Sequence, residues 1–131
     1  MRFAVLIAIV AAATMAGSAV AALPTFTNGP LVARKMEAHY NGATYKAKLA
    51  KIKARLTTRV LCAYDGSLRT VECDGKASIQ GATKRYLVSV QWELEKLAVN
   101  RARLRWTMSG SGASQSQREI VAPSAFGLKR F

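Results

Sequence analysis

The chain of 131 residues has little of what enzymes and metal sites are built from: one histidine, two cysteines and seven acidic residues. A structural zinc site takes about four Cys, His or carboxylate ligands, and no such set can be assembled around His39. The acidic residues lack the spacing of an EF-hand calcium loop, and no serine has the Gly-x-Ser-x-Gly context of a serine hydrolase. We therefore predict no metal, no cofactor and no catalytic residue.

Acidic residues are also scarce relative to basic ones. Twenty Lys and Arg against seven Asp and Glu give a net charge of +13. A surplus of this size attracts polyanions. The aromatic residues are not interleaved with the basic ones, as they are on RNA-stacking surfaces. We expect an anionic partner or a protein partner, and the pattern gives less support to nucleic acid.

Charge is missing from the apolar run Phe3 to Ala13, which follows Arg2 and leads to the small residues Ala19-Val20-Ala21. This order predicts a signal peptide over residues 1–22 and a single domain over residues 23–131. The alternative is an anchor that stays attached through residues 1–23, because that length spans a bilayer. We thus predict a secreted protein, and the alternatives are a periplasmic or a membrane-anchored one.

Export would give the two cysteines a structural role, because disulfides persist in oxidising compartments. Cys62 and Cys73 therefore predict one disulfide. If they face each other across a hairpin, Tyr64 lies opposite Val71 and the shared face is apolar. Such a bridge closes a loop of about a dozen residues and stabilises the fold by about 3 kcal/mol.

Residues 86–108 hold both tryptophans and alternate between apolar and polar side chains, which predicts a β-hairpin. In its second half one face carries Arg101, Arg103 and Arg105. The competing interpretation is a helix over residues 93–106, since Glu, Leu, Lys, Ala and Arg favour helices. The β-branched and aromatic content of the first half favours strands.

Residues 43–56 have the spacing of an amphipathic helix. The apolar positions are Tyr45, Leu49, Ile52 and Leu56. The other faces carry Lys46, Lys48, Lys51 and Lys53. A basic helix of this kind either contacts an anionic membrane surface or nucleic acid, or packs on a sheet with its lysines in solvent. The narrow apolar stripe favours packing on a sheet.

The remaining segments complete the predicted fold. Two prolines and an Asn-Gly pair predict an extended lead-in over residues 23–31, and a Gly/Ser-rich composition predicts a flexible loop over residues 109–117. Residues 57–108 are assigned to β-hairpins. We predict an α+β, mainly β domain with one N-terminal amphipathic helix and one disulfide. Its strands form an antiparallel sheet, or a small β-sandwich, of about five to six strands.

Two further function classes stay open. A secreted RNase-like hydrolase would need His39 beside Glu72 or Glu93 and an arginine of residues 101–105. A structural subunit of a cell envelope would need the N-terminal segment to stay attached. The charge favours a third class, a non-enzymatic protein that binds its partner through basic residues. The predicted binding surface is Arg101, Arg103 and Arg105 first, then Lys46, Lys48, Lys51 and Lys53.

An alanine-rich signal ending in Ala19-Val20-Ala21, a short mature chain, short strands and the pair Cys62 and Cys73 occur together. In this combination the chain resembles the small secreted effector proteins of plant-associated fungi, in particular the MAX effectors. The resemblance covers residues 57–122. It implies a β-sandwich stapled by a cystine and a virulence protein without enzymatic activity. It also implies a host partner that binds an exposed strand edge or a basic face.

Overall fold

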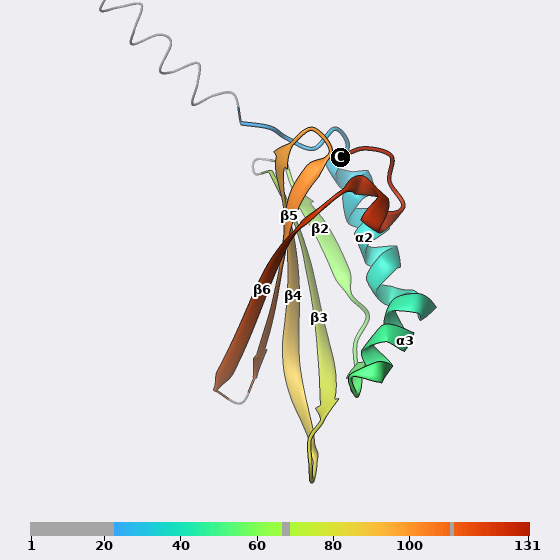
Figure 1. Ribbon diagram of the computed structural model, residues 1–131, viewed down its shortest axis with the longest axis vertical. Coiled ribbons are helices and arrows are strands. Elements are labelled where there is room, and N and C mark those ends of the chain that lie inside the picture. Colours follow the sequence, from blue (N-terminus) through green and yellow to red (C-terminus); the bar gives the residue numbers. More distant parts are fainter. Residues whose placement is uncertain (1–22, 67–68, 111) are drawn as a thin grey trace, which may run out of the picture.

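The computed structural model describes residues 23–66, 69–110 and 112–131 (Figure 1). The predicted signal peptide, residues 1–22, lies outside this described part. The described strands form one six-stranded antiparallel sheet, two helices lie against one of its faces, and one disulfide joins Cys62 to Cys73. This confirms the predicted α+β, mainly β class, in the form of a single sheet.

Helix α2 (Gly29–Asn41) begins where the extended lead-in was predicted. The Asn28 side chain caps it by accepting a hydrogen bond from the Leu31 N–H, and Pro30 stands in the first turn, where its missing N–H costs nothing. The predicted lead-in over residues 23–31 is therefore wrong from Gly29 onward, because the Asn-Gly-Pro sequence starts a helix here instead of breaking one. The buried face of α2 includes Met36, which is 0% exposed.

Helix α3 (Ala43–Lys51) is shorter than the predicted helix over residues 43–56. Lys53 has a φ of 58°, a left-handed conformation that a continuing α-helix excludes. The following residues form strand β1 (Ala54–Leu56), which pairs with β3. The prediction of one helix is thus corrected to two, and Leu56 belongs to the sheet.

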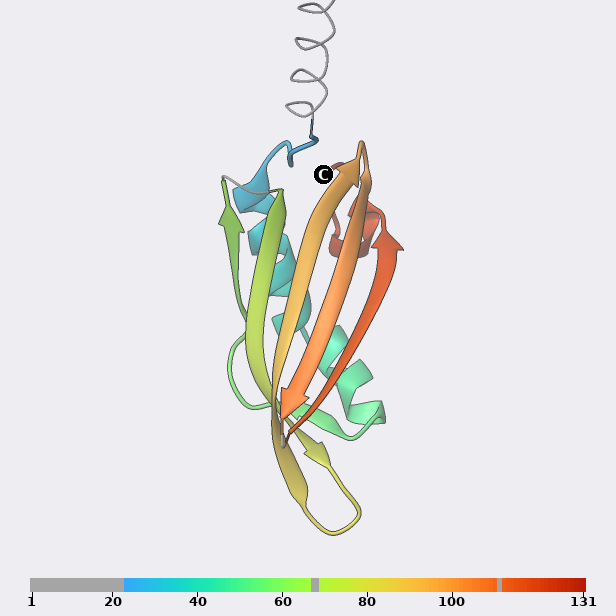
Figure 2. The same ribbon diagram turned by 90° about the vertical axis from the view of Figure 1, so that its left-hand side faces the viewer.

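The other strands follow in chain order. They are β2 (Leu61–Asp65), β3 (Thr70–Gln80), β4 (Arg85–Ala98), β5 (Arg101–Gly110) and β6 (Ala113–Val121). The sheet order is β1-β3-β4-β5-β6, and β2 pairs with β3 beyond the end of β1. A short 3-10 helix, η1 (Pro123–Phe126), follows β6. Figures 1 and 2 show a long, curved sheet with both helices on one side.

The predicted hairpin over residues 86–108 corresponds to β4 and β5. Trp92 lies opposite Trp106 and Leu94 opposite Leu104, so the alternating apolar residues do share one face. Residues 93–106 are strand and not helix. Asn100, at the turn, has a φ of 58°, a conformation that asparagine adopts more readily than most residues.

The predicted flexible loop over residues 109–117 is wrong for most of its length. Ser109 and Gly110 end β5 and pair with Ser114 and Ala113 of β6. The turn between the strands contains Gly112 with a φ of 78°, which glycine adopts without steric cost. The Ser/Gln-rich sequence is a strand because its backbone pairs with β5 along its whole length.

The core lies between α2 and the face of the sheet that α2 covers, which we call the inner face. Tyr40 of α2 stacks on Trp92 of β4, with ring centroids 4.3 Å apart. Cys62 lies opposite Cys73 and Tyr64 opposite Val71, which confirms the predicted register. A Cβ on Gly75 would stand 3.1 Å from Val60 Cγ2, so glycine at this position leaves room for the buried Val60 side chain.

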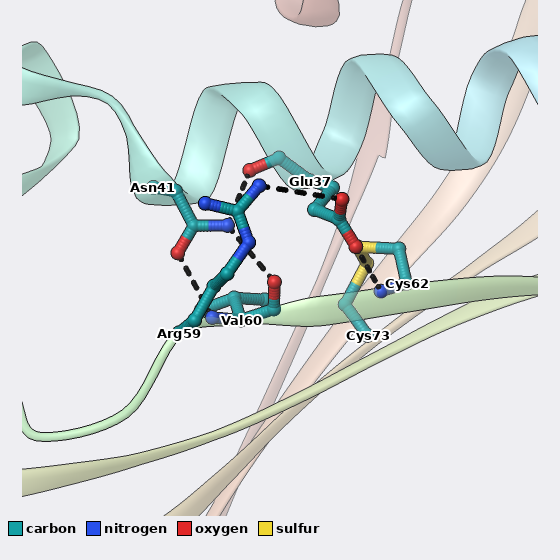
Figure 3. The surroundings of a disulfide bond; sticks show 6 residues. All are labelled: Glu37, Asn41, Arg59, Val60, Cys62 and Cys73. Carbon is teal, nitrogen blue, oxygen red and sulfur yellow. Dashed lines mark hydrogen bonds and ion pairs between the residues drawn. A yellow bond between two sulfur atoms is a disulfide. The ribbon is translucent and has the colours of Figure 1, made fainter.

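Side chains of α2 hold the edge of the sheet next to the disulfide (Figure 3). The Asn41 amide donates to the Val60 carbonyl oxygen at 2.9 Å and accepts from the Val60 N–H at 2.8 Å. The Glu37 carboxylate accepts from the Cys62 N–H at 3.1 Å and lies 3.6 Å from the Arg59 guanidinium. These contacts satisfy backbone groups on the side of the strand that faces away from β3.

The two ends of the described chain meet at one pole of the molecule (Figures 1 and 2). Phe131 is buried and packs edge-on against Phe26, with ring centroids 5.7 Å apart. Lys96, 7% exposed, donates from Nζ to the carbonyl oxygens of Thr25 at 2.7 Å and Phe131 at 3.3 Å. The Thr27 hydroxyl also donates to the Phe131 oxygen, at 2.7 Å.

Candidate functional site

The predicted arginine stripe lies on the outer face of the sheet, the face opposite the helices. Two of its members are in ion pairs with β4 of the same face: Arg103 with Glu95 at 3.1 Å, and Arg105 with Glu93 at 2.8 Å. Exposed pairs of this kind contribute about 0–1 kcal/mol to stability, but they neutralise part of the positive field. Arg101 is exposed at the start of β5.

Acidic residues gather on the same outer face, over β2, β3 and β4. They are Asp65, Glu72, Asp74, Glu93 and Glu95. Glu72 lies directly opposite Glu93. Desolvation and the neighbouring carboxylates, Glu93 first, raise the pKa of Glu72. The outer face therefore has an acidic half and a basic half.

The predicted lysines lie on the other side of the molecule, on and just after α3. Lys46, Lys48, Lys51 and Lys53 are all exposed. Within the described ranges none of these lysines makes an ion pair, and residues 43–56 contain no acidic residue. The structure thus separates the arginines from the lysines, and the two groups do not form one surface.

A cleft of about 600 Å³ opens between the helices and the inner face of the sheet. It exists because α2 contacts β2 and β3 and α3 contacts β1, so the inner side chains of β5 and β6 are only partly covered. Its apolar wall includes Leu49, Ile52, Leu56, Ile79, Val90 and Met108. Trp92 and Trp106, the two tryptophans of the chain, both line it.

Polar groups lie at the end of the cleft next to the junction of α2 and α3. The Tyr40 side chain is 2% exposed, and among the described residues its hydroxyl has no hydrogen-bond partner. Burial strongly raises the pKa of Tyr40, and the nearby Tyr45 and Glu119 raise it further. Burial also raises the pKa of Tyr45, and a hydrogen bond with Trp92 acts in the opposite direction and lowers it.

His39 belongs to this polar end. Its ring contacts Tyr40, Tyr45 and Phe126 at centroid distances of 5.1, 5.5 and 5.3 Å. Partial burial, and secondly the charge of Lys48, lower the pKa of His39. A neutral imidazole is therefore the favoured form at neutral pH.

The residues of the hydrolase hypothesis are not brought together. His39 is on the helix side, whereas Glu72, Glu93 and the arginines of β5 are on the outer face. The sheet separates the histidine from both carboxylates, so no proton shuttle can form among them. Within the described ranges no three His, Cys, Asp or Glu residues are grouped so that they could hold a metal ion.

Sequence reasoning missed the cleft. Its apolar residues were predicted only as faces that pack a helix on a sheet, because apolar alternation does not show whether a partner element covers a strand. The polar residues Tyr40, Tyr45 and Glu119 come from three different elements. No local spacing in the sequence could therefore have indicated that they meet.

In the part of the chain that the structure describes, no helix combines the length and the apolar character needed to cross a bilayer. The comparisons with known proteins found no matching family model, no matching curated protein and no matching solved structure.

Proposed function

We propose that this protein is a non-enzymatic binding module that captures an acidic partner through the exposed side of α3 and the segment after it. This cationic surface consists of Lys46, Lys51, Lys53 and Arg55. The observation that carries the proposal is the distribution of acids: five of the seven lie on the outer face of the sheet, and none lies in residues 43–56.

This distribution concentrates the unbalanced positive charge on one side. Arg103 and Arg105 were placed first in the sequence-based prediction, but Glu95 and Glu93 partly neutralise them. Among the described residues the lysines of α3 make no ion pair, so the positive potential is stronger on their side. We therefore rank the lysines before the arginines.

An acidic protein is the partner that best fits this surface. The exposed side of α3 presents Lys46, Lys51 and small residues such as Ala47, and no aromatic ring on which bases could stack. The disulfide supports a site of action in an oxidising compartment, and we include secretion in the proposal. A secreted, interaction-based role is also what the effector-like composition suggests.

The test is capture of partners from the compartment that the protein reaches, followed by binding of the captured partner at several salt concentrations. Two variants each remove three positive charges. The first is Lys46→Gln/Lys51→Gln/Lys53→Gln, and the control is Arg101→Gln/Arg103→Gln/Arg105→Gln. We expect the lysine variant to weaken binding at least tenfold and to flatten its salt dependence, because it removes unpaired cations. The arginine variant should lose less affinity for the partner.

Three probes identify the class of partner: immobilised polyglutamate, a single-stranded oligonucleotide and vesicles containing phosphatidylserine. Preference for polyglutamate supports the proposal. Equal losses of affinity in both triple variants would show that binding depends only on net charge, which would contradict the assignment to the cationic surface. An unchanged affinity in the lysine variant would remove the surface from consideration.

A further inference from the structure

The structure assigns a second binding site, separate from the cationic surface. We infer that the cleft between α3 and the inner face of the sheet binds a single-chain amphiphile that has an anionic, carboxylate-type head group. The apolar chain of this molecule would cover the uncovered side chains of β4 and β5. Its head would lie at the polar end, beside Tyr40 and Lys48.

The apolar part of the cleft has the size and the lining of a small-molecule site. Its volume of about 600 Å³ lies within the usual range for such sites, which are mostly apolar with a few convergent polar groups. Trp106, Met108 and Ile79 remain partly exposed on its wall, and α3, which lies over it, has no fully buried residue. Apolar side chains left in this state gain from being covered.

The Tyr40 hydroxyl is the observation that points to a ligand. A buried hydroxyl normally has a hydrogen-bond partner, and an unpaired one needs a reason. The hydroxyl lies close to Tyr45 and Glu119, which line the same cleft as Tyr40 itself. An oxygen of a bound head group would accept a hydrogen bond from this hydroxyl and so supply the missing partner.

The charge at the cleft selects the sign of that head group. Lys48 lines the cleft and, within the described chain, is in no ion pair. One carboxylate, Glu119, also lines the cleft near the Tyr40 hydroxyl and opposes an anionic head group there. The lysines of α3 add to the positive potential around the opening, so the field as a whole favours an anion over a cation.

The arrangement also fixes the orientation of the ligand. His39, Tyr40 and Tyr45 mark one end, where α2 meets α3, and Ile52 with Ile79 marks the other end, where α3 contacts β1 and β1 pairs with β3. A molecule that is polar at one end and apolar along its length matches this gradient. A compact polar metabolite would leave the apolar end uncovered.

The two tryptophans make the test direct, because both line the cleft and the chain has no other. The purified protein is titrated below the micelle concentration with dodecanoate, dodecanol and dodecylamine, which share one chain length and differ in head group. We expect a saturable change in tryptophan emission with dodecanoate, weaker binding of dodecanol, and the weakest binding of dodecylamine.

Matched variants locate the contacts. Lys48→Gln should weaken the binding of dodecanoate roughly tenfold and leave the affinity for dodecanol nearly unchanged, because it removes one charge-assisted hydrogen bond. Lys35→Gln, an exposed lysine of α2 outside the cleft, is its control. Leu49→Glu should abolish binding by placing a charge in the apolar wall. Ala47→Glu, on the exposed side of α3, should not.

Tyr40→Phe separates a ligand contact from a structural role. It should raise the thermal midpoint of the free protein, since it removes an unpaired buried hydroxyl. It should also reduce the stabilisation that dodecanoate adds. A variant that is destabilised and binds dodecanoate normally would contradict the assignment of Tyr40.

Two results would overturn the site. One is the absence of a saturable emission change with all three probes. The other is equal binding of all three probes together with no effect of Lys48→Gln. An emission change that coincides with dimer formation in size-exclusion chromatography assigns the cleft to a second copy of this chain and also overturns the proposal. Lys48 is not changed in the triple variants above, so failure here leaves the cationic surface standing.

Discussion

At the scale of single residues, His39 shows how position alters chemistry. The residue is exposed, but its ring contacts those of Tyr40, Tyr45 and Phe126, and Lys48 lies near enough for its charge to act on the imidazole. Both influences disfavour the protonated form. The histidine that the hydrolase alternative would need for proton transfer is therefore mostly neutral in this fold.

We expect the pKa of His39, followed by proton NMR, to lie below the usual value of 6.5. The assignment is unambiguous, because His39 is the only histidine. The unfolded chain binds the proton more readily, so acidification from pH 6.5 through the lowered pKa of the folded state should reduce stability.

Lys48→Gln is the matched change for this measurement and should raise the pKa of His39 part of the way back toward 6.5. The rest of the shift should persist, because burial is the larger cause. A wild-type pKa at or above 6.5 would contradict the arrangement of the rings and the lysine.

At the scale of elements, the edge of the sheet near Val60 depends on one side chain of α2. Asn41 pairs with both the N–H and the carbonyl of Val60, and its amide also donates to the Glu37 carbonyl oxygen at 2.9 Å. Because these backbone groups are partly buried, they have few other partners. A single asparagine thus joins the end of the helix to the strand.

Asn41→Ala should lower the free energy of unfolding by about 1–3 kcal/mol, because two backbone groups lose their partner. Urea denaturation checks this. Asn41→Asp is the comparison variant, since it keeps an acceptor for the Val60 N–H but turns a carboxylate oxygen toward the Glu37 and Val60 carbonyl oxygens. It should lose at least as much stability as the alanine variant. An alanine variant as stable as wild type would show that the contact contributes nothing.

The elements also show where sequence reasoning works. The alternation in residues 86–108 and the Cys62–Cys73 spacing were sufficient to predict β4, β5 and the register of β2 with β3, because a half-buried strand repeats every two residues. Most of β6 was missed because the residues from Ser114 to Ile120 are exposed on both faces, so no alternation marks it. The start of helix α2 was missed because Asn28 and Pro30 are breakers inside a helix and good residues at its start.

The proposed binding surfaces were harder to predict from the sequence, for a related reason. Composition shows that positive charge is in excess, but only the fold shows that Glu93 and Glu95 pair with two of the arginines, whereas the lysines of α3 make no ion pair within the described residues. The cleft depends on which inner side chains the helices leave uncovered. This coverage depends on the position of the helices relative to the sheet, and no local sequence pattern predicts that position.

At the scale of the whole molecule, the disulfide links the strand that α2 holds to the central part of the sheet. Cys73 is fully buried, and the bridge spans 11 positions of sequence. Cross-linking these positions restricts the unfolded chain far more than the folded one. The bridge should therefore matter more for stability than for the shape of the native state.

Reduction of the disulfide should lower the free energy of unfolding by about 3 kcal/mol. Urea denaturation with and without reductant measures the loss. Cys62→Ala/Cys73→Ala, which cannot form the bridge, is the control and should be insensitive to reductant. Equal midpoints for oxidised and reduced wild-type protein would contradict this stabilising role.

The meeting of Phe26 and Phe131 at one pole has a practical consequence for how the molecule is presented. α3 lies away from that pole (Figure 1), and so does the Ile52 end of the cleft. A bead, sensor chip or fusion partner joined near either end of the described chain would hold the molecule by the pole where Phe26 and Phe131 meet. The lysines of α3 would then face the medium, so the positions of the two ends determine the orientation on a support.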